Sequence, residues 1–306
     1  MTVSAKLGLL IIIAAVFPLC PDSAHSAVPP AGDSKGVDTV TIEAQRERQL
    51  KREVDTYVSS LLVTYMNDSL ERWDGPICPL VANLPRAQGE FILARIARIA
   101  KDSNAPLATN PCHPNFFVVV ADQPDLLIRK WVKRDPGMID TCNGTDYFRD
   151  FQHSRQPVRV YYNGKFVSSD GLSADTSALD LIGLSLDFRF TNPCIRGGVA
   201  GSHLRYGAVQ GISSVIIVVD STRTTGLNVG QLADYIGMVG LAQIRADRDT
   251  GTAPTILSVF GTSNPLPEGL SPWDQSFLRS LYTTNQQSVL QVSLIKSRMI
   301  QQIGGR

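Results

Sequence analysis

The chain has 306 residues, of which 43% are hydrophobic and 19% are charged, and its formal net charge is +1. These values are typical of a globular protein and exclude a chain that is disordered throughout. They also exclude the strong positive charge that favours binding to nucleic acid or to an anionic membrane surface.

The N-terminus has the pattern of a secretory signal peptide over residues 1–27. Lys6 precedes an apolar core from Leu7 to Leu19, and small residues follow as far as Ala27. The core is shorter than the ~20 residues that a membrane-spanning helix needs. We therefore expect cleavage and export to the bacterial periplasm or the extracellular space, with no transmembrane segment in the mature chain.

A lipid anchor at Cys20 is not expected. Bacterial lipoprotein sites have a small residue directly before the cysteine, and this chain has Leu19 there. Residues 28–41 are rich in proline and glycine and predict a flexible leader. The remaining residues, 42–303, are expected to form a single domain.

Four cysteines follow the signal peptide, and an even number in an exported chain predicts two disulfides. Three pairings can be drawn. We favour Cys78 with Cys112 and Cys142 with Cys194, because each bridge would then brace one local unit. A zinc site is the weaker interpretation, because no two cysteines lie two to four residues apart.

Hydrophobic periodicity predicts helices and buried strands in alternation along the first two thirds of the chain. An amphipathic helix is expected from Glu43, and a second from Arg86 to Asp102 with Arg95 facing outward. A short helix is expected at PDLLIRKWVKRDP. The predicted strands are Phe116–Ala121, Arg159–Tyr162 with a hairpin turn at Asn163-Gly164, Val215–Asp220, and an edge or hairpin strand within residues 179–190.

The segment Ser213–Ile244 is expected to be the centre of the fold. Val215–Val219 is a continuous β-branched run, as in a strand that is buried on both faces. A long helix follows, in which Ala233, Gly237 and Gly240 leave room for another element to pack closely.

Two helices are predicted at the C-terminal end. Ser271 is expected to cap the first, with Pro272 at its first helical position. The second is expected from Gln286 to about Ile303. Together these elements predict an α+β domain with a mixed β-sheet, packed helices and two disulfides.

The turn DSTRTTG after the central strand is one candidate site. Asp220, Thr222 and Thr224 match the pattern in which adhesion-type von Willebrand A domains resemble one another, where a carboxylate and two hydroxyls hold Mg²⁺. Too little chain follows Asp220 for that fold, and Asp, Ser and Thr are common in turns for local reasons. We therefore assign no metal to this turn.

Other catalytic patterns are incomplete. The mature chain has three histidines, His113, His153 and His203, and all lie outside the predicted helices. A hydrolase with an unconventional site would have to bring Asp220, Asp234 and His203 into one cleft. We expect no catalytic, metal-binding or cofactor-binding residues, and no cofactor.

Four blocks carry a resemblance to a known group. These are WDGPICPLVANLPRAQGEF, CHPNFFVVVADQPDLL, SSVIIVVDSTRTTGLNVGQLADYIGMVGLAQI and LSPWDQSFLRSLY. With them the chain resembles a group of exported proteobacterial proteins that have no assigned activity. More distantly, the order of elements is similar to that of domains related to secreted zinc peptidases. That resemblance implies a zincin-like fold, with a His-Glu motif at about Gln231–Tyr235, where this chain has neither residue.

The expected function follows from export and from the departure at Gln231–Tyr235. The first hypothesis is a non-catalytic envelope protein with a degenerate peptidase-like fold that binds a protein or a cell-wall ligand. The alternatives are a hydrolase at Asp220, Asp234 and His203, and a metal-dependent adhesion module at Asp220, Thr222 and Thr224.

Overall fold

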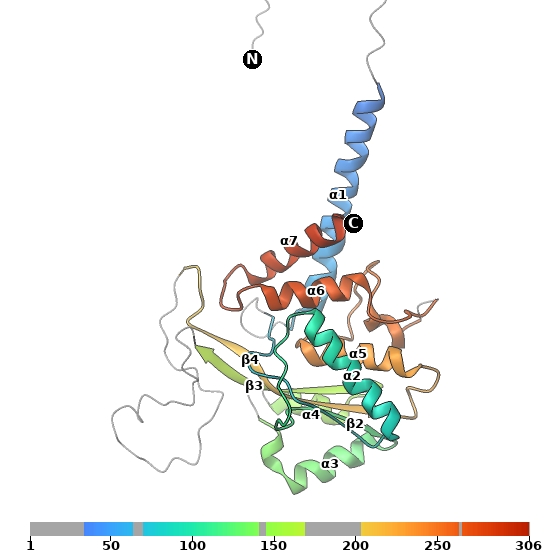
Figure 1. Ribbon diagram of the computed structural model, residues 1–306, viewed down its shortest axis with the longest axis vertical. Coiled ribbons are helices and arrows are strands. Elements are labelled where there is room, and N and C mark those ends of the chain that lie inside the picture. Colours follow the sequence, from blue (N-terminus) through green and yellow to red (C-terminus); the bar gives the residue numbers. More distant parts are fainter. Residues whose placement is uncertain (1–33, 64–69, 141–144, 169–202, 263–264, 306) are drawn as a thin grey trace, which may run out of the picture. The chain divides into compact units, whose positions relative to one another are not determined.

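The computed structural model describes residues 34–63, 70–140, 145–168, 203–262 and 265–305 (Figure 1). By its internal contacts the chain divides into Met1–Glu43 and Ala44–Arg306, and the sheet and core belong to the second unit. The described helices are α1 (Ser34–Leu61), α2 (Arg86–Asp102), α3 (Pro124–Arg134), α4 (Thr145–His153), α5 (Val229–Leu241), α6 (Pro272–Thr283) and α7 (Gln291–Gly304), with short 3₁₀ helices η1 (Pro136–Met138) and η3 (Ile256–Phe260).

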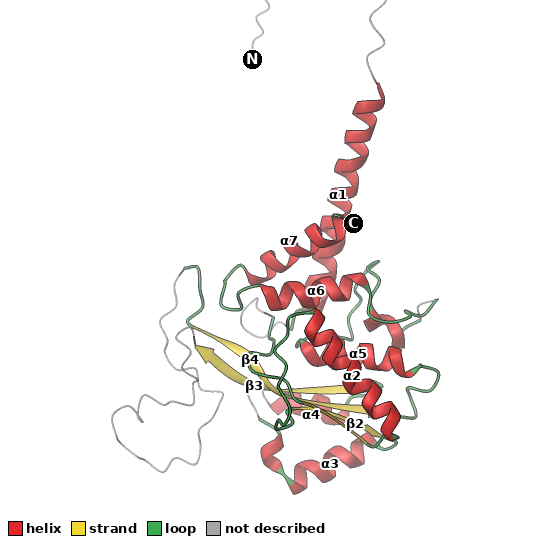
Figure 2. Ribbon diagram, viewed as in Figure 1, coloured by secondary structure: helices red, strands yellow, loops and turns green. Residues whose placement is uncertain are grey.

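The strands of the described segments form one mixed sheet of four, in the order β1-β2-β4-β3 (Figure 2). The strands β1 (Pro79–Ala82), β2 (Phe116–Ala121) and β4 (Ala208–Asp220) are parallel, and β3 (Val158–Ser168) is antiparallel at the edge. The predicted α+β domain with a mixed sheet is confirmed. The short strand β1 was missed, because the prolines around it argue against regular structure.

The predicted hairpin turn at Asn163-Gly164 is wrong. Strand β3 continues through these residues, and its register with β4 shifts there as at a β-bulge. Asp140 stabilises the bulge through two hydrogen bonds. Gly164 N–H donates to the Asp140 carboxylate at 2.7 Å, and Asp140 N–H donates to the Asn163 side chain at 2.9 Å. An Asn-Gly pair therefore marks an irregularity within a strand here.

Alternate residues of β4 face two separate layers of helices. Val215, Ile217 and Val219 belong to the main core with α2 and α5, whereas Ile216 and Val218 belong to a smaller cluster with α3 and α4. Residues alternate between the faces of a strand, so a continuous apolar run implies helices on both faces. The prediction that this run is buried on both faces is confirmed.

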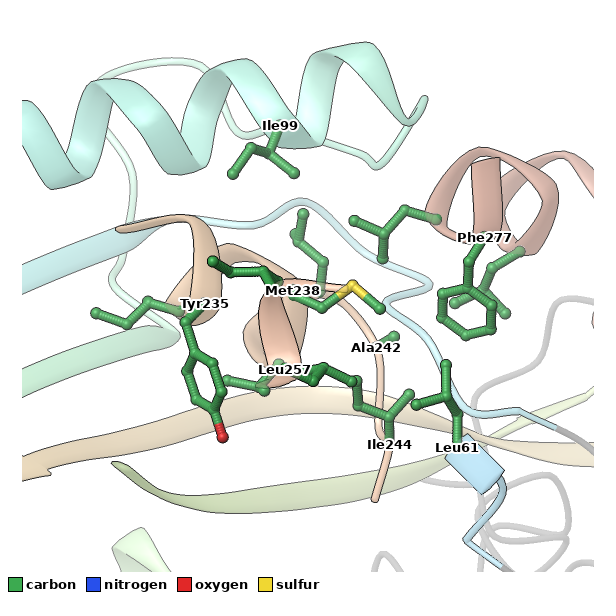
Figure 3. Packing of buried hydrophobic residues seen from close by; sticks show 14 of the residues in the cluster. Leu61, Ile99, Tyr235, Met238, Ala242, Ile244, Leu257 and Phe277 are labelled. Atoms are coloured by element: carbon green, nitrogen blue, oxygen red, sulfur yellow. The ribbon is translucent and has the colours of Figure 1, made fainter. Parts of the chain in front are cut away.

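Glycines in α5 let the helix pack closely, as predicted. A Cβ at Gly240 would lie 2.1 Å from the Phe116 ring, and one at Gly237 would lie 2.5 Å from Ile99. Figure 3 shows the core that results, in which Met238 of α5 lies among side chains from α1, α2, α6 and η3. The helix is shorter than expected and ends at Leu241, so Ile244 follows it.

A buried carboxylate on α6 forms hydrogen bonds with α1 and with the start of η3. Asp274 is fully buried and accepts from the hydroxyls of Tyr57 and Thr255, at 2.8 and 2.6 Å, and from two backbone N–H groups. It also forms a capping box with Ser271 at the start of α6, as the predicted cap implies. Burial raises the pKa of Asp274 although all four donors oppose that shift.

The disulfide between Cys78 and Cys112 is present, and it links the residues just before β1 and β2. The second predicted pair, Cys142 with Cys194, lies outside the described residues, as does the strand expected within 179–190. Helix α2 has the predicted bounds, but α1 begins before Glu43 and α7 begins after Gln286. Helix α4 was not predicted.

Among the helices of the described segments, none combines the length and apolar character that crossing a bilayer would require.

Candidate functional site: a groove along the edge strand

The edge strand β3 presents backbone groups that β4 does not use. Asp220 N–H donates to the Pro157 carbonyl at 2.8 Å, and the antiparallel register continues with Arg159 opposite Val218. In such a ladder hydrogen-bonded residues alternate with residues whose N–H and C=O point outward. Val158 and Val160 are therefore the outward residues at the start of β3.

The run of unused backbone groups on β3 ends at Tyr162, the next residue whose backbone faces outward. The Tyr147 hydroxyl forms a hydrogen bond with the Tyr162 backbone and so occupies the edge at that position. For Val158 and Val160 no hydrogen bond to another described residue replaces a neighbouring strand. An edge with unused backbone groups is the kind of surface to which another chain can add as a strand.

A cavity of about 620 Å³ lies beside this edge. A second cavity of about 570 Å³ continues it past the loop before η3, because Gln156, Tyr235, Ala246 and Asp247 line both. We call the two together the edge groove. Its first part is lined by β3, by α4 and by α5, with residues that include Tyr147, Asp150, Phe151, His153, Val158, Arg159, Val160, Tyr162, Tyr235, Val239, Arg245 and Asp247.

Three tyrosines shape the walls of the groove. Burial raises the pKa of Tyr147, Tyr162 and Tyr235 above the ordinary value, so they act as neutral hydrogen-bonding groups. Tyr162 O–H donates to the Val239 carbonyl at 2.5 Å and thereby ties β3 to α5. Tyr235 packs edge-on against Phe260, with ring centroids 4.8 Å apart. Aromatic walls beside a free edge suit the side chains of an extended peptide.

The charges along the groove include both signs. Arg159 is buried, donates to Asp125 at 2.5 Å and to the Gln152 carbonyl at 3.0 Å, and keeps its Nε without a partner among the described residues. Asp150 and Asp247 are exposed, and so is His153. No single sign dominates, which fits a peptide better than a strongly charged ligand.

A buried carboxyl lies near the same tyrosines. Burial raises the pKa of Glu71 to about 8, and the charge of Asp140 contributes to the shift. Its Oε2 is buried and has no hydrogen-bond partner among the described residues. The charge of Glu71 in turn helps to raise the pKa of Tyr147 and Tyr162.

This carboxyl predicts a fall in stability as the pH rises. The folded pKa of about 8 lies above the ordinary value of 4.5, so between these values the folded chain holds a proton that the unfolded chain has lost. The free energy of unfolding should decrease with a slope of up to about 1.4 kcal/mol per pH unit. Urea unfolding at several pH values would measure it. Glu71→Gln should flatten the curve, and an unchanged curve would contradict this assignment.

The structure gives the DSTRTTG turn a local role. The Thr222 N–H and hydroxyl both donate to the Asp220 carboxylate, at 2.9 and 2.6 Å, and the Thr224 hydroxyl donates to the Asp220 carbonyl at 3.0 Å. Asp220 itself is buried. The three residues therefore bond to one another within the turn, and the pattern of hydroxyls is explained by turn geometry.

The structure attaches Asp220, Asp234 and His203 to different elements. Asp234 forms a bidentate pair with Arg95, with Nη2–Oδ2 at 2.8 Å, and accepts from Leu270 N–H at 2.7 Å. His203 is exposed, next to a segment that bonds with residues 287–289. The three share neither a hydrogen-bond partner nor a described cavity. The Arg95 side chain is 35% exposed, and its guanidinium is paired with the buried Asp234.

The Gln231 side chain also forms hydrogen bonds that stabilise the fold. It forms a capping box with Asn228 at the start of α5 and donates to the Pro267 carbonyl at 2.8 Å. Gln231 and Asp234 therefore fasten residues 267–270 to α5. His113 is exposed before β2, and His153 is exposed at the end of α4. No group of three or more His, Cys, Asp or Glu within the described part of the chain could hold a metal ion.

The edge groove was not predicted from the sequence. It combines α4, β3, α5 and the residues after α5, and no spacing along the chain brings these together. The alternation in PVRVYYNG is the one signal that was available, because it predicts a strand whose two faces differ. With this geometry established, no family model, no curated protein and no solved structure matches the chain.

Proposed function

We propose that the chain is an exported, non-catalytic protein of the bacterial cell envelope that binds an extended segment of a partner protein along β3. The observation that carries the proposal is the outward backbone of Val158 and Val160 on the wall of the edge groove. Added strands are held by main-chain hydrogen bonds, and pockets for alternate side chains provide specificity.

A degenerate peptidase-like fold is part of the proposal. It is supported by the chain order of α2, β2, β4, α5 and α6, which matches the helix, strand, strand, long helix and C-terminal helix that the resemblance implies. The single strand β3 stands where the resemblance implies a hairpin, and α3 and α4 precede it. Where those domains carry a His-Glu motif, Gln231 and Asp234 hold a loop on α5. Tyr235 of the same turn lines the groove. Binding without hydrolysis is the function that this combination favours, and the signal-peptide pattern of residues 1–27 supports the export part of the proposal.

A proline at position 160 tests the role of the edge. The N–H of Val160 points away from β4. Val160→Pro therefore removes an outward donor and keeps all hydrogen bonds between β3 and β4. The ring would also obstruct an incoming strand. Val160→Thr is the matched control, because it is nearly isosteric and keeps the N–H.

The probe is a set of ten-residue peptides selected for binding to the mature protein from a random library. We expect Val160→Pro to weaken their binding at least about tenfold, and Val160→Thr to change it less than about threefold. Equal binding by Val160→Pro and the wild type, or a failure to select any peptide, would overturn the proposal.

Hydrogen exchange tests the edge without a ligand. The amides of Arg159 and Tyr161 face β4 and should exchange slowly, whereas the amide of Val160 should exchange much faster. Slow exchange at Val160 in the free protein would mean that another part of the chain already covers the edge, and would contradict the proposal. The same measurement on Val160→Pro reports whether that variant keeps the β3–β4 pairing.

A further inference from the structure

A small cavity between α2 and α6 gathers three arginine side chains. Its volume is about 310 Å³, and it is lined by Arg95, Arg98, Ile99, Asp102, Ser103, Leu270, Gln275 and Arg279. It shares no lining residue with the edge groove, so its role is independent of the proposed function.

The arginines are not fully neutralised by carboxylates. Arg95 is matched by Asp234, which holds it in a bidentate pair. Within the described part of the chain, Asp102 is the acidic residue that lies beside Arg98 and Arg279. The Arg98 Nε lies 3.9 Å from the Asp102 carboxylate, beyond hydrogen-bond distance, and Arg279 Nε–H donates to the Asp102 carbonyl at 3.3 Å. Among the described residues, three guanidinium groups at this cavity face two carboxylates, Asp234 and Asp102, which leaves an excess of one positive charge.

The orientation of the two side chains leaves donors for a ligand. Arg279 uses its Nε–H on the backbone, so its terminal N–H groups have no partner among the described residues. Arg98 extends from the neighbouring helix at the same cavity. Guanidinium groups recognise phosphate and similar oxyanions through paired N–H donors, and the positive charge assists.

We infer that this cavity binds one compact oxyanion, a phosphate or sulfate group, between Arg98 and Arg279. The group could be a free anion or the phosphate of a lipid headgroup, since both offer the same oxygens. The two arginines and the Asp102 carboxylate together carry one net positive charge. That charge matches one bound anion and does not match a second.

The test follows the Nε–H signals of the arginines by NMR in the mature protein labelled with ¹⁵N. Inorganic phosphate is titrated at constant ionic strength, with chloride as the reference anion. We expect saturable shifts at Arg98 and Arg279, and at least about tenfold weaker binding in Arg279→Gln. Arg134→Gln is the control, because Arg134 is exposed on α3, away from the cavity.

Vesicles separate the two sources of the anion. Phosphatidylglycerol and phosphatidylcholine vesicles are compared in co-sedimentation with the wild type, Arg279→Gln and Arg134→Gln. Phosphate binding that Arg279→Gln alone weakens assigns a free anion, and sedimentation with phosphatidylglycerol that Arg279→Gln alone abolishes assigns a lipid. The inference is overturned if neither probe binds, or if both substitutions have equal effects.

Discussion

Replacement of Asp274 with alanine is expected to lower the free energy of unfolding by about 4 kcal/mol. The side chain accepts four hydrogen bonds at a fully buried position, from Tyr57, Thr255, Ile256 and Ser271. Alanine would leave all four donors without their carboxylate partner, and one of these lost bonds is the Ser271 N–H half of the capping box of α6. The measurement is urea unfolding followed by circular dichroism.

Two further substitutions show whether the hydrogen bonds are the cause. Asp274→Asn should cost about half as much, because its amide oxygen can face the two backbone N–H groups while its NH₂ faces hydroxyls that can turn to accept. Asp146→Ala, at an exposed helical position, should change the stability by less than about 0.5 kcal/mol. Equal losses for Asp274→Ala and Asp274→Asn would point to packing instead.

Gly240→Ala is expected to destabilise the protein by about 3 kcal/mol or to prevent folding. The new methyl carbon would lie 2.1 Å from the Phe116 ring, which is fully buried and stacked on Trp73 and so has no space to move into. Helix α5 would have to shift away from β2. Thermal unfolding of the purified variant measures the effect, and an unchanged melting temperature would contradict the close approach of helix and strand.

The control uses a helical glycine that has room. A Cβ at Gly89 in α2 would lie 3.8 Å from Val81, an ordinary contact, so Gly89→Ala should be neutral or stabilising by up to about 1 kcal/mol. Phe116→Leu in the Gly240→Ala background should recover part of the lost stability, because it shortens the ring that the methyl group meets. Failure of this rescue would place the strain elsewhere.

The edge groove depends on the same packing that these substitutions disturb. Gly240 sets the distance of α5 from the sheet, and Tyr162 of β3 donates to the α5 carbonyl at Val239. The groove lies where α5 and β3 meet, so its width follows from a contact in the core. A shift of α5 should therefore change peptide binding as well as stability.

The local pattern of the sequence was enough to predict the central elements. The run Val215–Val219 is apolar on every residue, and such a run requires cover on both faces of a sheet. The spacing of isoleucines in residues 86–102 and the cap at Ser271 depend on neighbours within a few positions, so their helices were predictable. The pair Cys78 and Cys112 was favoured because it would brace one local unit, a helix and the strand that follows it, and this disulfide is present.

The surroundings of the candidate residues were decided by contacts between distant parts of the chain. Asp234 and Arg95 are separated by 139 positions, and their pairing turns a candidate catalytic residue into a structural one. The Asn163-Gly164 pair favours a turn by itself, but pairing with β4 keeps the strand continuous. The edge groove lies beside β3 because β3 is the last strand in the order that the described residues form, and the order of strands in a sheet is a property of the tertiary structure.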